Sequence, residues 1–247
     1  MNVVYGPVRS WRLGRSIGID PISVEPKVCT FNCIYCQLGS KGIVTDRRSL
    51  FVKEQAVKEQ LAALLRRKKV GVVVTFSGTG EPTLASNLIE MVEIVSDLTD
   101  YPIGILTNSS LFHNPEIREA MKLFDFIVAK LDAACEETYQ RVNRPHPFIG
   151  FRMAVENIEL MRKEFEGDFY LQIMFIKENL KDVDGLVEIC DRIGPDLVFL
   201  NTPLRPSMTR PLGKKEMRSI SKSFDRFRCR MVYDIESEHD QGTTKRQ

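Results

Sequence analysis

Apolar residues alternate along the chain between short continuous runs and longer stretches with helical spacing. In the longer stretches they recur three or four positions apart, which predicts amphipathic helices. These helices are expected over 57–65, 84–95, 116–123, 151–165 and 183–193. The continuous runs are typical of strands covered on both faces. These strands are expected over 16–20, 70–76, 103–107, 126–131, 169–176 and 197–200.

The predicted strands and helices alternate, which indicates parallel β-α units connected by right-handed crossovers. A complete eight-unit barrel takes about 250 residues. Six units with short loops in 247 residues therefore predict an α/β fold, a partial (β/α)6 TIM-like barrel. We expect one domain over 1–235, with a short C-terminal extension from about 207, and a disordered polar tail over 236–247.

The composition, with 43% apolar and 28% charged residues, is that of an ordinary globular chain. No apolar run approaches the ~18 residues of a membrane span, so we expect no membrane association and a cytoplasmic protein. The net charge of +2 is uninformative, but nine Lys or Arg and two acids lie within 205–230. That segment is either a phosphate-attracting patch or a solvated helix face followed by a charged edge strand.

Three cysteines stand close together at Cys29, Cys33 and Cys36, with C-x3-C-x2-C spacing after the first predicted strand. No fourth cysteine or histidine lies nearby in the sequence. A structural zinc site takes four protein ligands, whereas an iron–sulfur cubane held by three thiolates keeps one iron open to another ligand. The alternative is three reduced cysteines in a loop without metal. The other cysteines are dispersed, and Cys190 and Cys229 follow apolar patterns typical of core residues.

The octet 29–36, with Tyr35 before its last cysteine, resembles the signature of the radical S-adenosylmethionine (radical SAM) superfamily. The resemblance implies a [4Fe-4S] cluster on Cys29, Cys33 and Cys36. It also implies SAM bound at the open iron and reductively cleaved to a 5'-deoxyadenosyl radical. Further segments are similar to the wyosine-synthase-like branch, related to 4-demethylwyosine synthase. They are 4–10, 13–20, 37–39, 76–84 and 143–147.

The loop 78–82, Gly-Thr-Gly-Glu-Pro, follows the second predicted strand. It has two glycines of a dinucleotide fingerprint but Thr83 at the third position, so a Rossmann interpretation is weak. The loop resembles the Gly-Gly-Glu motif of radical SAM proteins, with Thr79 inserted. That resemblance implies that Gly78, Gly80 and Glu81 contact the SAM ammonium. The alternative is a tight turn with a solvent-exposed glutamate.

Polar residues end other predicted strands, where the loops of an α/β barrel build the site. Asn108 and Asp132 could hydrogen-bond the ribose or carboxylate of SAM, or serve only as helix caps and turn residues. The resemblance places Asn201 beside the adenine, and we group Tyr35 with these cofactor-binding candidates. On the substrate side the candidates are Arg144, Lys177 and Arg205. The alternative for Arg144 is that the segment 141–147 is only a stiff surface turn.

The chain departs from the wyosine enzyme in two ways. It has no cysteine before Cys29, where that enzyme has ligands for a second cluster. It also extends only about forty residues past the barrel, which leaves little room for a separate RNA-binding domain. The substrate therefore stays open among three hypotheses. The first is a radical SAM enzyme acting on a tRNA base or small molecule. The second is an activase or modifier of a protein or peptide, and the third is a non-catalytic iron–sulfur module. Either enzyme would need an electron donor such as ferredoxin or flavodoxin.

Overall fold

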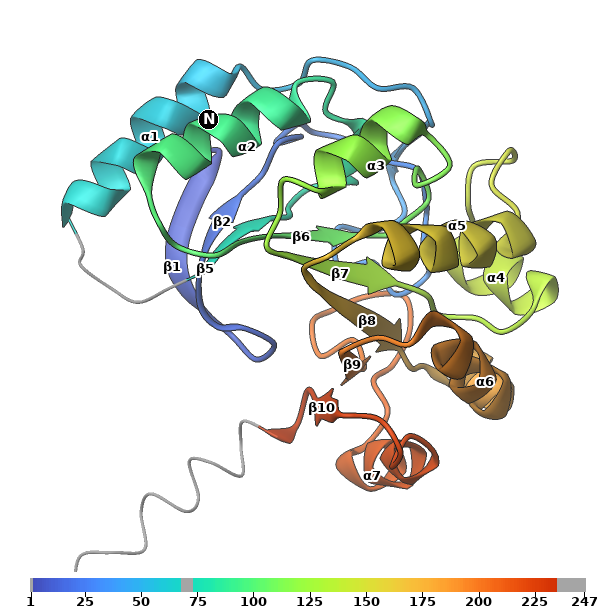
Figure 1. The fold of residues 1–247 in the computed structure, drawn as a ribbon. Helices are drawn as coiled ribbons and strands as arrows, with labels where there is room; N and C mark the ends of the chain where they lie inside the picture. The colour runs from blue at the N-terminus through green and yellow to red at the C-terminus, as the bar shows by residue number, and fades with distance from the viewer. Residues whose placement is uncertain (1, 68–72, 235–247) are drawn as a thin grey trace, which may run out of the picture.

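The structure is a computed structural model that describes residues 2–67 and 73–234. Its main sheet is curled and has the strand order β1-β2-β5-β6-β7-β8-β9-β10 (Figure 1). The strands are β1 Val4–Ser10, β2 Gly14–Ile19, β5 Val73–Phe76, β6 Ile103–Thr107, β7 Phe126–Lys130, β8 Asp168–Met174, β9 Leu197–Asn201 and β10 Cys229–Met231. All neighbours pair in parallel except β1, which is antiparallel to β2. The predicted partial barrel is confirmed.

Helices cover the outer face of this sheet and leave its inner face to the site (Figure 1). They are α1 Glu54–Arg67, α2 Leu88–Leu98, α3 Pro115–Met121, α4 Glu136–Asn143, α5 Phe151–Glu164, α6 Val183–Ile193 and α7 Lys214–Ser223. Short 3-10 turns, η1 Pro82–Leu84 and η2 Lys177–Asp182, precede α2 and α6. Buried aliphatic residues of these helices pack on the strands in one large core.

The six predicted strands correspond to β2 and β5 to β9, and the five predicted helices correspond to α1, α2, α3, α5 and α6. Residues 70–72 of the second predicted strand lie outside the described residues. The predicted helix over 84–95 is divided in the structure, because η1 holds its first residue and α2 begins at Leu88. The apolar pattern does not predict β1 or the small sheet of β3 Lys27–Cys29 with β4 Gly42–Val44. The basic segment 205–230 forms α7 and the edge strand β10, as its second interpretation expected.

Aromatic side chains fill the barrel interior toward the amino ends of the strands. Phe126 and Tyr170 have ring centroids 5.9 Å apart, Tyr170 and Phe199 5.6 Å, and Trp11 packs edge-on to Phe199 at 5.6 Å. Trp11 comes from the turn between β1 and β2, so this hairpin contributes to the interior packing. These four rings form an aromatic layer in the interior.

No helix in the described ranges is long and apolar enough to cross a lipid bilayer. The prediction of one domain over 1–235 stays a prediction. The tail predicted over 236–247 lies outside the described residues.

Candidate functional site

The cysteine loop is fixed by backbone hydrogen bonds at several points. It begins at the end of β3, where the Cys29 carbonyl accepts from Thr45 N at 3.0 Å. Asn32 N donates to the Asn143 carbonyl at 3.1 Å, and Ile34 N donates to the Val142 carbonyl at 3.0 Å. Since these two carbonyls belong to the end of α4, a distant helix sets the path of the loop between its cysteines.

Two cysteine sulfurs receive amide hydrogen bonds from other elements. Asn108 Nδ2 lies 3.6 Å from Cys29 Sγ, and Asn143 Nδ2 lies 3.7 Å from Cys33 Sγ. Hydrogen bonds to ligand sulfurs help set the properties of iron–sulfur clusters. No three cysteine, histidine or carboxylate side chains of the described residues converge on one metal ion. Because each thiolate of a cubane binds its own iron, three thiols on one loop, two of them with amide donors, fit a cluster better than one zinc ion.

The cysteine thiols are buried, and burial opposes their ionisation. Burial, followed by the charge of Glu81, raises the pKa of Cys29 to about 12. Burial also raises the pKa of Cys33, and the positive charge of Lys130 opposes this rise. A cluster binds thiolates, so its binding must displace these protons.

The loop after β5 packs directly on the strand that leads to Cys29. A Cβ atom on Gly80 would lie 1.9 Å from the Val28 carbonyl oxygen, and one on Gly78 would lie 2.1 Å from Asp20 Cγ. Gly80 is therefore required for close approach of two backbones, and Gly78 leaves room for the Asp20 side chain. Thr79 donates to Asp20 Oδ2 through its backbone N at 3.0 Å and through its hydroxyl at 2.8 Å.

Glu81 is buried and has all its partners within the protein, which corrects the alternative of a solvent-exposed glutamate. Its Oε1 accepts from Thr83 N at 3.2 Å, Thr83 Oγ1 at 2.7 Å and Thr107 Oγ1 at 2.6 Å. Its Oε2 accepts from Asn108 N at 2.8 Å. Burial raises the pKa of Glu81, and these hydrogen bonds act against the rise. The carboxylate thus positions Asn108, whose side chain donates to Cys29.

A buried polar network surrounds Tyr35. Its hydroxyl contacts Asp132 Oδ2 and Lys130 Nζ, and accepts from Asn143 Nδ2 at 3.0 Å. Lys130 pairs with Asp132 at 3.2 Å and lies 3.9 Å from the centroid of the Tyr35 ring. The other oxygen of Asp132 accepts from Met174 N at 2.7 Å. Asp132 therefore ties the cysteine loop to β7, β8 and α4.

Of the remaining predicted residues, Asn201 is buried, and the three substrate-side candidates are exposed. Asn201 ends β9, with its Oδ1 accepting from Thr202 N at 2.9 Å. Arg144 and Lys177 are exposed, and Arg144 caps α4 with a φ of 45°. Arg205 is also exposed, but its Nη1 donates to Gln37 Oε1 at 3.0 Å, beside the cysteine loop. Direct contacts of the predicted residues with SAM or substrate stay predictions.

The sequence assigned no role to Asn143 and Lys130, two residues of the polar network. Asn143 was within a segment quoted for the family resemblance, and Lys130 precedes Asp132 at a strand end. Their roles depend on contacts with Tyr35, which lies 108 and 95 residues away in the chain. Position at a strand end was the signal that could have drawn attention to Lys130.

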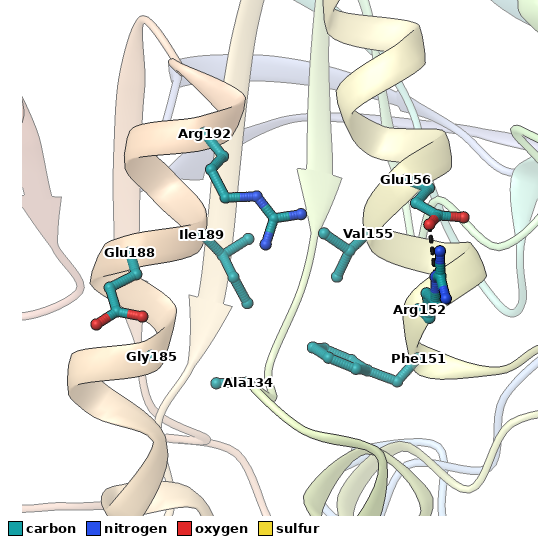
Figure 2. Close-up of a pocket in the computed structure, with 9 residues that line it drawn as sticks. All are labelled: Ala134, Phe151, Arg152, Val155, Glu156, Gly185, Glu188, Ile189 and Arg192. Atoms are coloured by element: carbon teal, nitrogen blue, oxygen red, sulfur yellow. Dashed lines mark hydrogen bonds and ion pairs between the residues drawn. The ribbon is translucent and has the colours of Figure 1, made fainter.

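Other notable features lie away from this network. Cys190 is fully buried in the main core, and Cys229 packs against it, as predicted. A hollow of about 580 Å³ lies on the outer layer between α5 and α6 (Figure 2). Phe151, Val155 and Ile189 face one another across it, with charged residues around them. It includes no predicted site residue.

Several proteins of known sequence are similar to this chain. It is 33% identical over 252 residues to a GTPase Obg of Brachyspira hyodysenteriae, covering 98% of this chain and 36% of that protein. It is 38% identical to UPF0026 protein slr1464 of Synechocystis, covering 82% of this chain and 76% of the relative. It is 25% identical to a probable GTP 3',8-cyclase of Methanococcus maripaludis, covering 87% and 71%. The chain thus spans about a third of the first of these relatives and most of the other two.

Solved structures share the fold at low sequence identity. A radical SAM methyltransferase from Sphaerobacter thermophilus has a TM-score of 0.70 and 13% identity, covering 88% of this chain and 65% of that one. TYW1 with a lysine–pyruvate adduct bound has a TM-score of 0.66 and 18% identity, covering 88% and 76%. The model of the radical SAM superfamily matches residues 26–190, which include the cysteine loop and the Gly-Thr-Gly-Glu-Pro loop. The chain therefore belongs to the radical SAM superfamily of enzymes, whose members bind a [4Fe-4S] cluster and SAM.

Proposed function

We propose that this protein cleaves SAM reductively and uses the resulting radical to modify a substrate. One observation carries the proposal: three thiols on one loop, two of them receiving amide hydrogen bonds, beside the glycine-containing loop after β5. The bound cluster and SAM supply the electron and the 5'-deoxyadenosyl radical. The chain supplies three thiolate ligands, the amide donors behind them and a buried framework that sets their positions.

The predicted cofactor-binding residues divide into two buried carboxylates and five other residues. Glu81 and Asp132 have both carboxylate oxygens engaged within the protein. We infer that these two position the loops that bind SAM. The others are proposed to contact SAM itself: Tyr35, Gly78, Gly80, Asn108 and Asn201. The substrate-side residues proposed are Arg144, Lys177 and Arg205.

The substrate proposed first is a tRNA base or a small molecule. Among the similar proteins, one is named a probable GTP 3',8-cyclase and one structure holds a lysine–pyruvate adduct. Both names support nucleotide or small-molecule chemistry, and the second supports the wyosine-synthase-like branch. We further propose an electron donor of the ferredoxin or flavodoxin kind, and a cytoplasmic location.

The test is anaerobic reconstitution with iron and sulfide, addition of SAM and dithionite, and measurement of 5'-deoxyadenosine. We expect product from the wild type and no product from Cys36→Ala. Without product, a SAM-induced change in the cluster's electron paramagnetic resonance spectrum would still support SAM binding at the open iron. A full cluster that neither cleaves SAM nor changes its spectrum would contradict the proposal.

A further inference from the structure

Arg12 lies at the tip of the β1–β2 hairpin and reaches into the barrel. Its Nε donates to Gln172 Oε1 on β8, and its guanidinium carbon lies 4.6 Å from the centroid of the Trp11 ring. Its backbone oxygen accepts from Arg230 Nη1 at 2.6 Å, which joins the hairpin tip to β10. These contacts hold the hairpin tip against strands from the opposite side of the sheet.

The register of the sheet shows that Gln172 faces the barrel interior. Gln172 pairs with Lys130 on β7 and with Phe199 on β9. Residues paired across neighbouring strands project from the same face. Lys130 contacts Tyr35 and Phe199 contacts Trp11 on that face. The Arg12 guanidinium therefore lies between the aromatic layer and the network next to the cysteine loop.

Arg12 has no carboxylate partner among the described residues, and a second arginine is close to it. Its side chain contacts Gln172 and the Trp11 ring, which are both uncharged. Burial and then the positive charge of Arg205 lower the pKa of Arg12 to about 10. Arg205 likewise has no carboxylate partner in the described part of the chain, and its Nη1 donates to Gln37. Gln37 directly follows Cys36, so Arg205 lies beside the cysteine loop.

Two guanidinium groups whose charges act on each other, and which have no carboxylate partner among the described residues, favour an anion that joins them. Desolvating a charge without pairing it costs free energy, and two like charges repel each other. The guanidinium presents a planar set of donors that matches the oxygens of a carboxylate or a phosphate. We propose that Arg12 and Arg205 together bind the carboxylate or phosphate group of a small-molecule substrate in the barrel interior. This inference rests on the proposed function and names the substrate class for the same site.

The interior position favours a small molecule over a nucleic acid backbone. Arg12 is only partly accessible at the hairpin tip, whereas phosphates along a nucleic acid bind exposed cations. The competing explanation is structural, with Arg12 only holding the hairpin to Gln172. In that case replacing Arg12 would alter stability and leave anion binding unchanged.

Trp11 offers a direct reporter, because it is the only tryptophan in the chain and packs on the Arg12 guanidinium. The reconstituted protein would be titrated with inorganic triphosphate and, separately, with succinate. Tryptophan fluorescence and calorimetry would both follow binding. We expect saturable binding of at least one anion, and the tighter one distinguishes phosphate from carboxylate chemistry.

Variants identify the residues responsible. Arg12→Gln and Arg205→Gln should each weaken binding roughly tenfold to a hundredfold, the range for hydrogen bonds to charged groups. Arg12→Lys keeps the charge without the planar donors and should fall between wild type and Arg12→Gln. Arg15→Gln is the matched control, since Arg15 is exposed on the same hairpin, and should bind as wild type does. If Arg12→Gln does not fold, the exposed Arg205 still tests the pair.

Either of two results would overturn the inference. One is absence of saturable binding of both anions to the wild type. The other is equal weakening by Arg15→Gln and Arg12→Gln, which would indicate unspecific attraction to positive charge. The 5'-deoxyadenosine assay separates this inference from the proposed function. Anion binding by a protein whose full cluster neither cleaves SAM nor changes its spectrum when SAM is added would uphold the site and contradict the function. SAM cleavage without anion binding would do the reverse.

Discussion

Glu81 and Arg12 are both charged side chains that the fold places inside the barrel, and their surroundings differ. The Glu81 carboxylate accepts four hydrogen bonds, from Thr83, Thr107 and Asn108. The Arg12 guanidinium donates to one protein acceptor and lies near another cation. Both oxygens of Glu81 thus have hydrogen-bond partners within the protein. In the described part of the chain, the Arg12 guanidinium has one hydrogen-bond acceptor.

The difference indicates which charge maintains the structure and which one serves a ligand. A fully hydrogen-bonded buried charge rigidifies its surroundings, and removing it leaves several partners unsatisfied. A poorly partnered charge contributes little to stability and is favoured by an incoming ion of opposite sign. Each prediction below tests this contrast in the free energy of unfolding or in ligand binding.

The largest effect is expected from removing the cluster ligands while Glu81 and Arg12 stay in place. Cys29→Ala, Cys33→Ala or Cys36→Ala should each abolish the absorbance of the full cluster together with SAM cleavage. Three thiolates are the smallest set that leaves one open iron. Iron content and visible absorbance after reconstitution would measure this. Retention of the full cluster by any one variant would contradict the ligand assignment.

Glu81→Gln should weaken SAM binding roughly tenfold and destabilise the protein by about 1 to 3 kcal/mol. A carboxylate only accepts hydrogen bonds, whereas the Gln amide would direct donors toward Thr83 N or Asn108 N, which also donate. Iron content should stay intact. Calorimetric SAM titration and denaturant unfolding would measure the two effects. Unchanged SAM affinity would indicate that the loop is only a tight turn without a role in SAM binding.

The same variant predicts a dependence on pH. A carboxyl group whose pKa is raised on folding stabilises the protein at low pH, and this contribution is lost as the pH rises through the folded-state pKa. Burial raises the pKa of Glu81. The stability difference between wild type and Glu81→Gln should therefore be larger at acidic than at neutral pH. A difference that grew as the pH rose would indicate a lowered pKa instead.

Cys190→Ala provides a reference outside both regions. Cys190 is fully buried in the core on α6, and removing its sulfur leaves unfilled space. We expect a loss of roughly 1 to 2 kcal/mol of stability. Iron content and anion binding should equal those of the wild type. A loss of iron would show that Cys190 has a metal-related role.

Arg12→Gln should change the free energy of unfolding least, by less than about 1 kcal/mol. The substitution removes one hydrogen bond to Gln172 and also removes a poorly partnered charge, so the two effects oppose each other. Thermal and denaturant unfolding beside Arg15→Gln would measure the change. A loss of stability as large as that of Glu81→Gln would show that Arg12 maintains the structure. It would contradict the contrast between a structural Glu81 and a ligand-binding Arg12.

Much of the fold could be predicted because its signals are local. The run over 103–107 coincides with β6, and the helical spacing over 183–193 coincides with α6. Continuous apolar runs and a helical apolar face show directly in neighbouring residues. β1 escaped prediction because Val4–Ser10 contains Gly6 and Pro7 and pairs only through one edge with β2. β3 and β4 were too short to give a pattern.

The site was only partly visible in the sequence. The cysteine loop and the Gly-Thr-Gly-Glu-Pro loop are contiguous motifs, so their residue types and spacing indicated chemistry directly. The partners of Glu81 could not be predicted, because Thr107 and Asn108 come from the next strand. Burial of Glu81, which the motif alone left open, follows from that neighbouring strand end.

By itself the sequence determined the β-α order of the barrel and the three clustered thiols, since both arise from residues close together in the chain. Only the tertiary structure decided which distant groups meet those thiols and line the interior. Asn143 reaches Cys33 across 110 residues, and Arg12 reaches Gln172 across 160. Such contacts depend on how the sheet curls and on the path of the hairpin, and a pattern along the chain records neither.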